Sequence, residues 1–288
     1  MEDAKKSFYH FSKLENRLME GKKMVEINIE DLEKKLDEFK TQRPYHHCIV
    51  DNFFSSQLAV QLEKEFPDYN SSQWYVYRNP LENKKALNSW DTFPKHTYQV
   101  MSYLSSPQFI EGILQKKLNT PFFADPGLHG GGWHIHGECG NLNPHLDYHI
   151  HPKLGLVRKL NLIIYLSQSL FPEEHGGHFG LWEHDLNSNL PGKLLKEITP
   201  IFNRAVLFDT TQNSWHGMSR PLTVPQGIFR KSLAIYYLTP LQETDMTTRK
   251  RALFAPRPEQ KGNPVIEAII KKRVEENSSQ EVYRTENT

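Results

Sequence analysis

A change in hydrophobic periodicity after Pro121 restricts the fold of this chain more than any other feature of its sequence. Before Pro121, apolar residues recur at spacings of three and four, as between Ile29 and Phe39, a pattern typical of amphipathic helices. After it, apolar residues alternate with their neighbours, as between Leu160 and Leu166, a pattern typical of strands. Many short strands separated by glycine and proline turns, without intervening helices, favour a sandwich or barrel of the jelly-roll type. We therefore expect an α+β protein.

The same patterns predict individual elements. Helices are expected at residues 29–39, 97–104 and 107–118, and another after Ser55 or Ser56, either of which is a good N-cap. Strands are expected at residues 47–50, 133–136, 160–166, 179–183, 205–209 and 232–238. Residues 67–95 are rich in Trp, Tyr, Asn and Lys and are expected to form an irregular loop, either a substrate lid or a structured connection.

Three parts of the chain differ in character. Residues 1–43 are expected to be an N-terminal helical extension packed outside the barrel. Residues 44–240 are expected to form the main domain, with its barrel core at about 121–240. Residues 241–288 read as a C-terminal extension, partly disordered, with a short helix at about 264–274 before a polar tail.

Charge and composition exclude several classes of protein. The 35 Lys and Arg residues nearly cancel the 34 Asp and Glu residues, which argues against nucleic acid as a partner. No apolar run approaches the roughly 18 residues that would span a membrane. Two cysteines, Cys48 and Cys139, are too few for a disulfide framework or a thiolate zinc site. Because the chain also opens on a polar segment and not on a signal peptide, we expect a cytoplasmic protein.

Histidines are concentrated in the middle of the chain. Ten of the 14 lie in the predicted barrel region, at His129, His134, His136, His145, His149, His151, His175, His178, His184 and His216. Several of them fall on short strand-like segments, where a cluster of imidazoles indicates metal binding.

The segment His145-Leu146-Asp147 carries the sharpest metal signal. On a strand, residues i and i+2 face the same side, so His145 and Asp147 project together into one cavity. Two imidazoles and one carboxylate form the facial triad of non-haem iron(II) oxygenases, which leaves the opposite face of the metal open. His216, which follows the predicted strand at 205–209, is the candidate for the third ligand.

Arg230 lies at the mouth of the last apolar strand, where it could bind a small diacid. The far carboxylate of such a diacid in a closed cavity needs a permanently charged, two-pronged partner. The charges of iron(II), Asp147, a dianionic 2-oxo diacid and Arg230 then sum to zero, as a dry pocket requires. Ser232 faces the same side of the strand as Arg230 and could donate a hydroxyl hydrogen bond.

Taken together, these motifs resemble the iron(II)/2-oxoglutarate-dependent dioxygenase superfamily, in its prolyl 4-hydroxylase-like branch. The resemblance covers roughly residues 44–240 and consists of five motifs in family order. They are the entry at 49–54, His145-Leu146-Asp147 with the strand at 158–166, the glycine turn at 176–182, the segment around His216 at 214–217, and Arg230 to Leu233.

The resemblance implies a double-stranded β-helix, a jelly-roll or cupin-like barrel with helices packed outside. It implies His145, Asp147 and His216 as iron ligands and Arg230 as the partner of the far carboxylate of 2-oxoglutarate. Tyr165 matches a tyrosine that commonly binds the same carboxylate. Asn161, on the same face as Tyr165, could line the cosubstrate pocket.

The activity implied by the resemblance is hydroxylation of an unactivated C–H bond. Iron(II) is the expected cofactor, 2-oxoglutarate and dioxygen the cosubstrates and ascorbate a supporting reductant, and the co-products are succinate and carbon dioxide. Asp147 favours hydroxylation over halogenation, because related halogenases lack the metal carboxylate. A small molecule or amino acid is the expected substrate. Arg158, His134, His136 and Trp90 are candidate substrate contacts.

Other functions compete with this interpretation. A cupin-type metal site could use His134 and His136, which face the same side of a strand, together with Glu138 and a later histidine. A non-catalytic barrel that binds a metal, a sugar or a partner is a second alternative, although such a protein should have lost a triad member or Arg230. A peptidyl-prolyl hydroxylase acting on a protein is a third. The near-zero charge counts against a fourth, a nucleic-acid demethylase.

Overall fold

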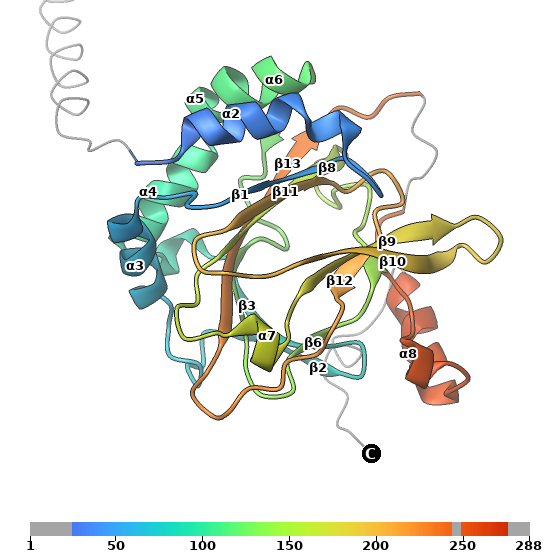
Figure 1. The fold of residues 1–288 in the computed structure, drawn as a ribbon. Coiled ribbons are helices and arrows are strands. Elements are labelled where there is room, and N and C mark those ends of the chain that lie inside the picture. Colours follow the sequence, from blue (N-terminus) through green and yellow to red (C-terminus); the bar gives the residue numbers. More distant parts are fainter. Residues whose placement is uncertain (1–24, 244–248, 276–288) are drawn as a thin grey trace, which may run out of the picture.

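The computed structural model describes residues 25–243 and 249–275. Two antiparallel sheets face each other, and helices cover the outer side of the larger sheet (Figure 1). The larger sheet has nine strands in the order β1-β11-β8-β13-β5-β3-β2, with β4 paired to β13 and β6 to β3. Its strands are β1 (His47–Val50), β2 (Tyr75–Asn79), β3 (Glu82–Leu87), β4 (Phe123–Ala124), β5 (Gly132–His136), β6 (Asn141–Leu142), β8 (Val157–Tyr165), β11 (Ala205–Asp209) and β13 (Arg230–Thr239).

The smaller sheet has five strands in the order β10-β9-β12-β7-β14. They are β7 (His145–Leu146), β9 (Phe179–Asp185), β10 (Leu190–Ile198), β12 (His216–Met218) and β14 (Leu253–Phe254). Every strand pair in both sheets is antiparallel, and the predicted α+β class with the strand arrangement of a double-stranded β-helix is confirmed. In the described residues the two sheets remain open at their edges and do not close into one ring.

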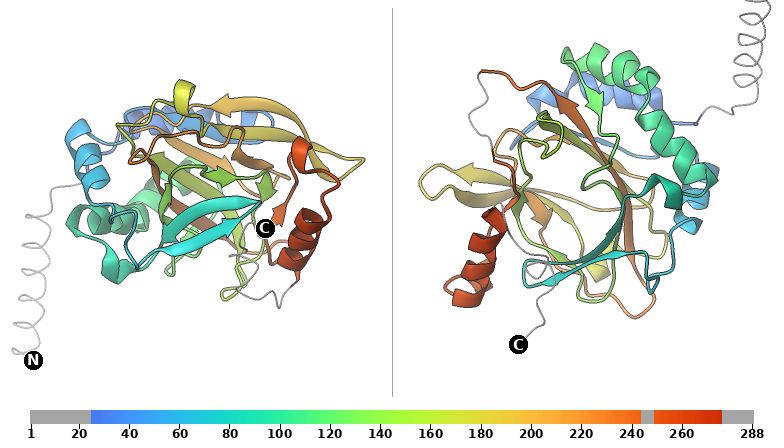
Figure 2. Two further views of the ribbon diagram at one scale, coloured as in Figure 1. Left: turned by 90° about the horizontal axis from the view of Figure 1, so that it is seen from below. Right: turned by 180° about the vertical axis from the view of Figure 1, so that it is seen from behind.

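Helices form the outer layer. α2 (Ile29–Asp37), α4 (Lys95–Leu104) and the irregular helix at 107–118 lie over the large sheet, with α3 (Ser56–Lys64) beside them (Figures 1 and 2). The irregular helix consists of α5 (Pro107–Phe109), a π-helical stretch at Ile110–Gln115 and α6 (Lys116–Leu118). Ser55 is the N-cap of α3, as predicted, because its hydroxyl accepts a hydrogen bond from the Leu58 amide. Two more helices, α7 (Pro172–His175) and α8 (Pro264–Val274), lie elsewhere on the molecule.

Along three strands, side chains that pack in the hydrophobic core alternate with side chains that line the site. On β8, Leu160, Leu162 and Ile164 join the hydrophobic core beneath the helices, whereas Asn161 and Ile163 line a cavity between the sheets. On β13, Leu233 and Ile235 face the core while Ser232, Ala234 and Tyr236 face the cavity. The same division on β5 places Trp133 and Ile135 in the core. His134 and His136 line the cavity.

The segment at 67–95 differs from the prediction. It is not an irregular loop, because residues 75–87 form the hairpin β2–β3, and β3 pairs with β5 to extend the large sheet. The hairpin contains Lys, Asn and Glu, residue types that are depleted in strands. The sequence of this segment therefore does not predict its two strands. The strand β10 was also not predicted.

The two ends of the chain are described only in part. Residues 1–24 and 276–288, where the sequence predicts an extension and a polar tail, lie outside the described residues. Leu32, Leu36 and Phe39 pack into the main core, and α8 forms where the sequence predicts a helix. The domain boundaries at 43 and 240 stay predictions. Across the part of the chain that the structure describes, no helix is long and apolar enough to span a membrane.

Candidate active site

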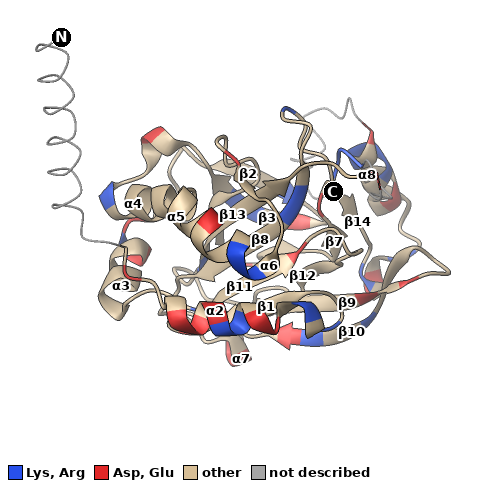
Figure 3. Cartoon of the chain, turned by 90° about the horizontal axis from the view of Figure 1, so that it is seen from above, with Lys and Arg blue, Asp and Glu red and all other residues tan. Residues whose placement is uncertain are grey.

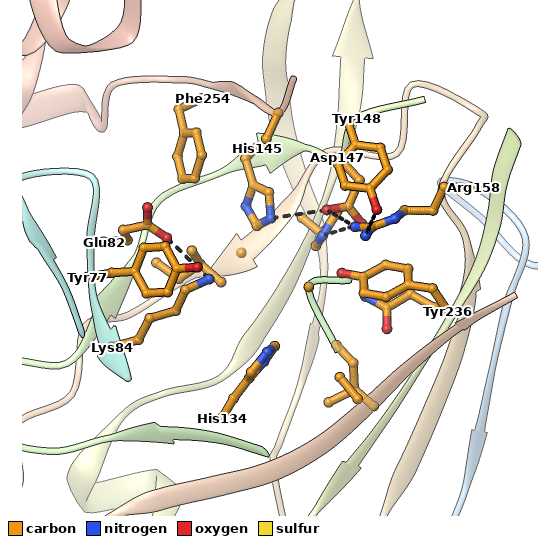
Figure 4. Close-up of a pocket in the computed structure, with 18 of the residues that line it drawn as sticks. Tyr77, Glu82, Lys84, His134, His145, Asp147, Tyr148, Arg158, Tyr236 and Phe254 are labelled. Carbon is orange, nitrogen blue, oxygen red and sulfur yellow. Dashed lines mark hydrogen bonds and ion pairs between the residues drawn. The ribbon is translucent and has the colours of Figure 1, made fainter. Parts of the chain in front are cut away.

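A cavity of about 630 Å³ opens between the two sheets. The inward-facing residues of β5, β8 and β13 line one side of it, and β7, β12 and β14 line another. Polar and charged side chains from these strands and from β3 point into it (Figure 4). The cavity therefore collects polar residues from segments that are far apart in the sequence.

His145, Asp147 and His216 meet at this cavity. His145 on β7 is the register partner of His216 on β12, and Asp147 follows β7 by one residue. Their candidate donor atoms all lie within 4.8 Å of one another, and all three side chains are buried. Asp147 Oδ1 is 3.9 Å from His145 Nε2, and Asp147 Oδ2 is 3.8 Å from His216 Nε2.

The hydrogen bonds of the two histidines set their tautomers. His145 Nδ1 lies 3.0 Å from the carbonyl oxygen of Asn143, and His216 Nδ1 lies 2.8 Å from that of Ser214. Because a carbonyl oxygen only accepts hydrogen bonds, each Nδ1 carries the proton and each Nε2 presents a lone pair to the shared space. Burial, with the neighbouring His216, lowers the pKa of His145 to about 3, and burial also lowers the pKa of His216. Both imidazoles are therefore neutral, as metal ligands must be.

Asp147 supplies a buried carboxylate between the two rings. Burial alone would raise its pKa, but electrostatic interactions with His216, Arg158 and His145 outweigh this effect and hold the pKa below its usual value. Asp147 Oδ2 is buried and accepts no hydrogen bond from the described residues. Two neutral imidazole nitrogens and an ionised carboxylate with an open lone pair fit a divalent metal of the iron type.

Arg158, expected to contact substrate, lies against Asp147 instead of standing free in the cavity. Its Nη1 is 3.6 Å from Asp147 Oδ1, and only 2% of the residue is exposed. The guanidinium carbon lies 3.5 Å from the ring centres of both Tyr148 and Tyr236, so the group is held between two aromatic faces. Nη2 also donates to the Tyr148 hydroxyl and to the His129 carbonyl. Arg158 thus pairs with the Asp147 carboxylate and also lines the cavity.

Arg230 lies on the inner face of β13, on the cavity wall. It is buried, and its Nε donates to the Gly177 carbonyl oxygen at 2.8 Å. Its guanidinium carbon is 4.8 Å from the centre of the Tyr165 ring. Ser232 and Asn161 line the same cavity, and Asn161 Oδ1 is buried without a hydrogen-bond partner among the described residues. The structure therefore brings the four predicted cosubstrate residues into one neighbourhood.

His134 and His136 are on the cavity wall as well. Burial and the charges of Lys84 and Arg230 lower the pKa of His134 to about 3, and burial with Arg230 lowers that of His136 well below its usual value. Trp90 does not reach the cavity: its indole nitrogen donates to the Pro126 carbonyl oxygen, and its ring packs on Phe93 and Tyr98.

The remaining central histidines are not part of the triad. His129 lines the cavity, whereas His149 and His151 are buried and do not line it. His151 Nε2 lies 3.3 Å from Asp125 Oδ2. His184 accepts a hydrogen bond from the Trp215 indole, and His175 packs on Phe171.

Several site residues come from segments that the sequence analysis left unassigned. Phe254 on β14 stacks on His145, with ring centres 4.9 Å apart and planes 13° apart. Arg249 Nη2 donates to the Asp147 carbonyl oxygen at 2.9 Å. On the hairpin, Glu82 forms an ion pair with Arg273 of α8, and Lys84 Nζ lies 3.2 Å from the same carboxylate. No sequence signal marks these residues, because their roles depend on contacts between distant segments.

Comparisons with known proteins agree with this geometry. Residues 131–238 match the family model of the 2OG-Fe(II) oxygenase superfamily. This segment is a domain of that superfamily. The chain is therefore a dioxygenase, whose cofactor is iron(II) and whose cosubstrate is 2-oxoglutarate.

Solved structures share the fold. A prolyl hydroxylase from Trichoplax adhaerens, in complex with a hypoxia-inducible-factor peptide fragment, aligns with a TM-score of 0.51 at 16% identity, covering 73% of this chain and 90% of its own. A prolyl 4-hydroxylase from Pseudomonas putida aligns with a TM-score of 0.50 at 15% identity, covering 72% and 98%. A search of curated sequences found no match. At such identities the likeness shows a common fold and leaves the substrate open.

Proposed function

We propose that this dioxygenase hydroxylates an unactivated C–H bond of a small molecule, such as an amino acid. In this proposal His145, Asp147 and His216 hold iron(II), and Arg230 binds the far carboxylate of 2-oxoglutarate. The observation that carries the assignment is the meeting of the three donor groups within 4.8 Å, on a cavity that Arg230 also lines.

Bound iron(II) would supply the activation of dioxygen that converts 2-oxoglutarate to succinate and carbon dioxide. The residues of the chain provide the geometry for this chemistry. The backbone carbonyls of Asn143 and Ser214 fix the two imidazole rings through Nδ1. Tyr165 packs beside Arg230 and can help to orient its guanidinium, and Ser232 and Asn161 line the cavity, where they can help to orient the cosubstrate.

Charge balance supports the same assignment. The Arg230 guanidinium is held by the Gly177 carbonyl and is buried, so it needs a negative partner in the cavity. A carboxylate of 2-oxoglutarate would satisfy this need with paired, charge-assisted hydrogen bonds. The carboxylate of Asp147 favours hydroxylation over halogenation. A halide can bind the metal only where no carboxylate ligand occupies that coordination position.

The borders of the cavity support a small substrate. The hairpin β2–β3 contributes Tyr77 and Lys84, and the C-terminal segment contributes Phe254, so both sides of the triad are bordered by protein (Figure 4). A cavity of about 630 Å³ lies within the usual range for small-molecule sites.

A succinate-release assay tests the proposed function. Purified protein is incubated with iron(II), ascorbate and 2-oxoglutarate, with and without amino acids and other small molecules. His145→Ala should abolish turnover, and Arg230→Ala should raise the 2-oxoglutarate requirement at least about tenfold, as expected for a lost charged hydrogen bond.

Matched controls keep this assay specific. His175→Ala and Arg220→Ala change a histidine and an exposed arginine outside the cavity and should behave like wild type. Full activity of His145→Ala would contradict the ligand assignment. Stimulation by proline-containing peptides but by no small molecule would contradict the proposed substrate class.

A further inference from the structure

A segment beyond the family match lies against the strand that carries His145. The match to the superfamily model ends at residue 238, and β14 begins at Leu253. β14 lies beside β7 (Figure 3), with Phe254 opposite His145 in the register, and the Ala255 amide donates to the Pro144 carbonyl oxygen at 2.8 Å. Residues 253–260, here called the β14 segment, therefore border the metal site without belonging to the matched domain.

Asn143 connects the β14 segment to His145. It is fully buried, and its backbone carbonyl oxygen accepts the hydrogen bond from His145 Nδ1. Its side-chain Nδ2 donates to the Ala255 carbonyl oxygen at 3.0 Å and to Gln260 Oε1 at 2.6 Å. The residue that sets the tautomer of His145 is thus held in place by the β14 segment.

Arg257 binds the same asparagine and also reaches the end of β12. It is buried, and its guanidinium donates four hydrogen bonds, all to neutral oxygens. The acceptors are Asn143 Oδ1 (from Nε, 3.1 Å), Asn141 Oδ1 (from Nη2, 2.6 Å), the Met218 carbonyl oxygen (from Nη2, 2.7 Å) and the Ser219 carbonyl oxygen (from Nη1, 3.4 Å). Because arginine presents five N–H donors in a rigid planar fork, one side chain can join several segments, whereas the ammonium of lysine is a compact point.

These contacts span the two strands that carry the metal histidines. Asn143 lies two residues before His145, and the two carbonyl groups lie two and three residues after His216. In the described residues, β7 and β12 share a single register pair, His145 with His216, so the ladder between them is short. The two backbones are also in contact, because a Cβ at Gly217 would lie only 2.6 Å from the Asn143 carbonyl oxygen. A shift of either strand would move one imidazole relative to the other, and Arg257 opposes such a shift.

We propose that Arg257 is a positioning residue of the iron site. It fixes Asn143 and the end of β12, so that Nε2 of His145 and Nε2 of His216 face the same ion. The proposal rests on the metal ligands of the proposed function and adds a residue from outside the matched domain. Removing a group that orients metal ligands typically lowers metal affinity by about 10–100-fold.

Cobalt(II) titration tests this inference without substrate or turnover. The full-length protein is titrated with cobalt(II) by calorimetry, and the visible spectrum of the bound ion reports the geometry of its ligands. The variants are Arg257→Gln, Arg257→Lys and Gln260→Ala, and thermal unfolding measures the stability of each. Two controls lie outside the cavity: Arg220→Lys changes an exposed arginine, and Val100→Ala opens the buried core at α4.

Arg257→Gln should weaken cobalt(II) binding by about tenfold or more and change the visible spectrum of the bound ion. Arg257→Lys should also weaken binding, because it keeps the charge but loses the fork. Gln260→Ala removes one acceptor of the Asn143 amide and should weaken binding in the same direction by a smaller factor. Val100→Ala should unfold at a lower temperature but keep the wild-type cobalt(II) affinity and spectrum, and Arg220→Lys should match wild type throughout.

Wild-type cobalt(II) affinity and spectrum in folded Arg257→Gln would overturn the inference. An equal loss of affinity in Val100→Ala would do so as well, because the effect would then follow stability and not ligand position. If Arg257→Gln does not fold, Gln260→Ala decides, and wild-type binding by that variant would overturn the inference. Failure of cobalt(II) to bind wild type would instead contradict the metal ligands of the proposed function.

Discussion

The buried carboxylate of Glu82 ties the hairpin β2–β3 to α8, and its replacement by glutamine gives a quantitative prediction. Glu82 is 1% exposed and pairs with Arg273 and Lys84. Burial alone would raise its pKa, but the charges and hydrogen bonds of Lys84 and Arg273 lower it from 4.5 to about 2. The folded protein therefore stabilises the ionised Glu82 carboxylate more than the unfolded chain does.

The size and sign of the effect follow from linkage. A difference of about 2.5 pH units corresponds to about 3 kcal/mol of stability from the ionised carboxylate. Because the folded pKa is depressed, this contribution is complete above about pH 4.5 and is lost as the pH falls towards 2. Glu82→Gln lacks the charge at every pH, so it should be less stable than wild type by about 3 kcal/mol at neutral pH, with the gap closing in acid.

Denaturant unfolding at several pH values between 7 and 3 measures this gap. The free energies of unfolding of wild type and Glu82→Gln are compared with those of Glu259→Gln, which changes an exposed glutamate on the same C-terminal segment. Glu259→Gln should follow wild type throughout. A Glu82→Gln gap that is absent at pH 7, or that stays constant down to pH 3, would refute the reasoning.

Three further substitutions test the packing around the site. Phe254→Leu removes the ring stacked on His145 and should cost about 1 kcal/mol of stability and weaken manganese(II) binding, measured by calorimetry; unchanged metal affinity would contradict a role in positioning His145. Arg158→Lys keeps the charge but loses the flat group held between Tyr148 and Tyr236, and should lower the free energy of unfolding by about 1–3 kcal/mol; a wild-type value would argue against the stack. Trp133→Ala opens the core beneath β5 and should cost about 3–5 kcal/mol in the same measurement, and a loss below 1 kcal/mol would be inconsistent with full burial.

The core of the site could be read from the sequence because it lies on strands with clean alternation. On β8 and β13, every second residue is a large apolar group that packs under the helices, so the facing of Asn161, Arg230 and Ser232 follows from counting. The i, i+2 relation of His145 and Asp147 likewise fixes a shared direction. The pairing of β7 with β12, which brings His216 to them, leaves no periodic signal; the sequence marks His216 only as a histidine that follows the strand at 205–209.

The rest of the site depends on tertiary contacts that leave no local pattern. Glu82 and Arg273 are 191 residues apart, and only their contact explains a buried glutamate on a strand. Phe254 follows a polar segment, and its pairing beside β7 gives no periodic signal in a two-residue strand. Arg158 lines the cavity, and its role as a substrate contact stays a prediction; its direction toward Asp147 depends on two tyrosine rings from separate segments.

Anomalous diffraction from crystals of the full-length protein grown with manganese(II) and 2-oxoglutarate tests the central claim most directly. We predict a single strong peak bonded to Nε2 of His145, a carboxylate oxygen of Asp147 and Nε2 of His216, with the far carboxylate of 2-oxoglutarate on Arg230. A peak held by His134, His136 and Glu138 instead, or 2-oxoglutarate bound away from Arg230, would contradict the account.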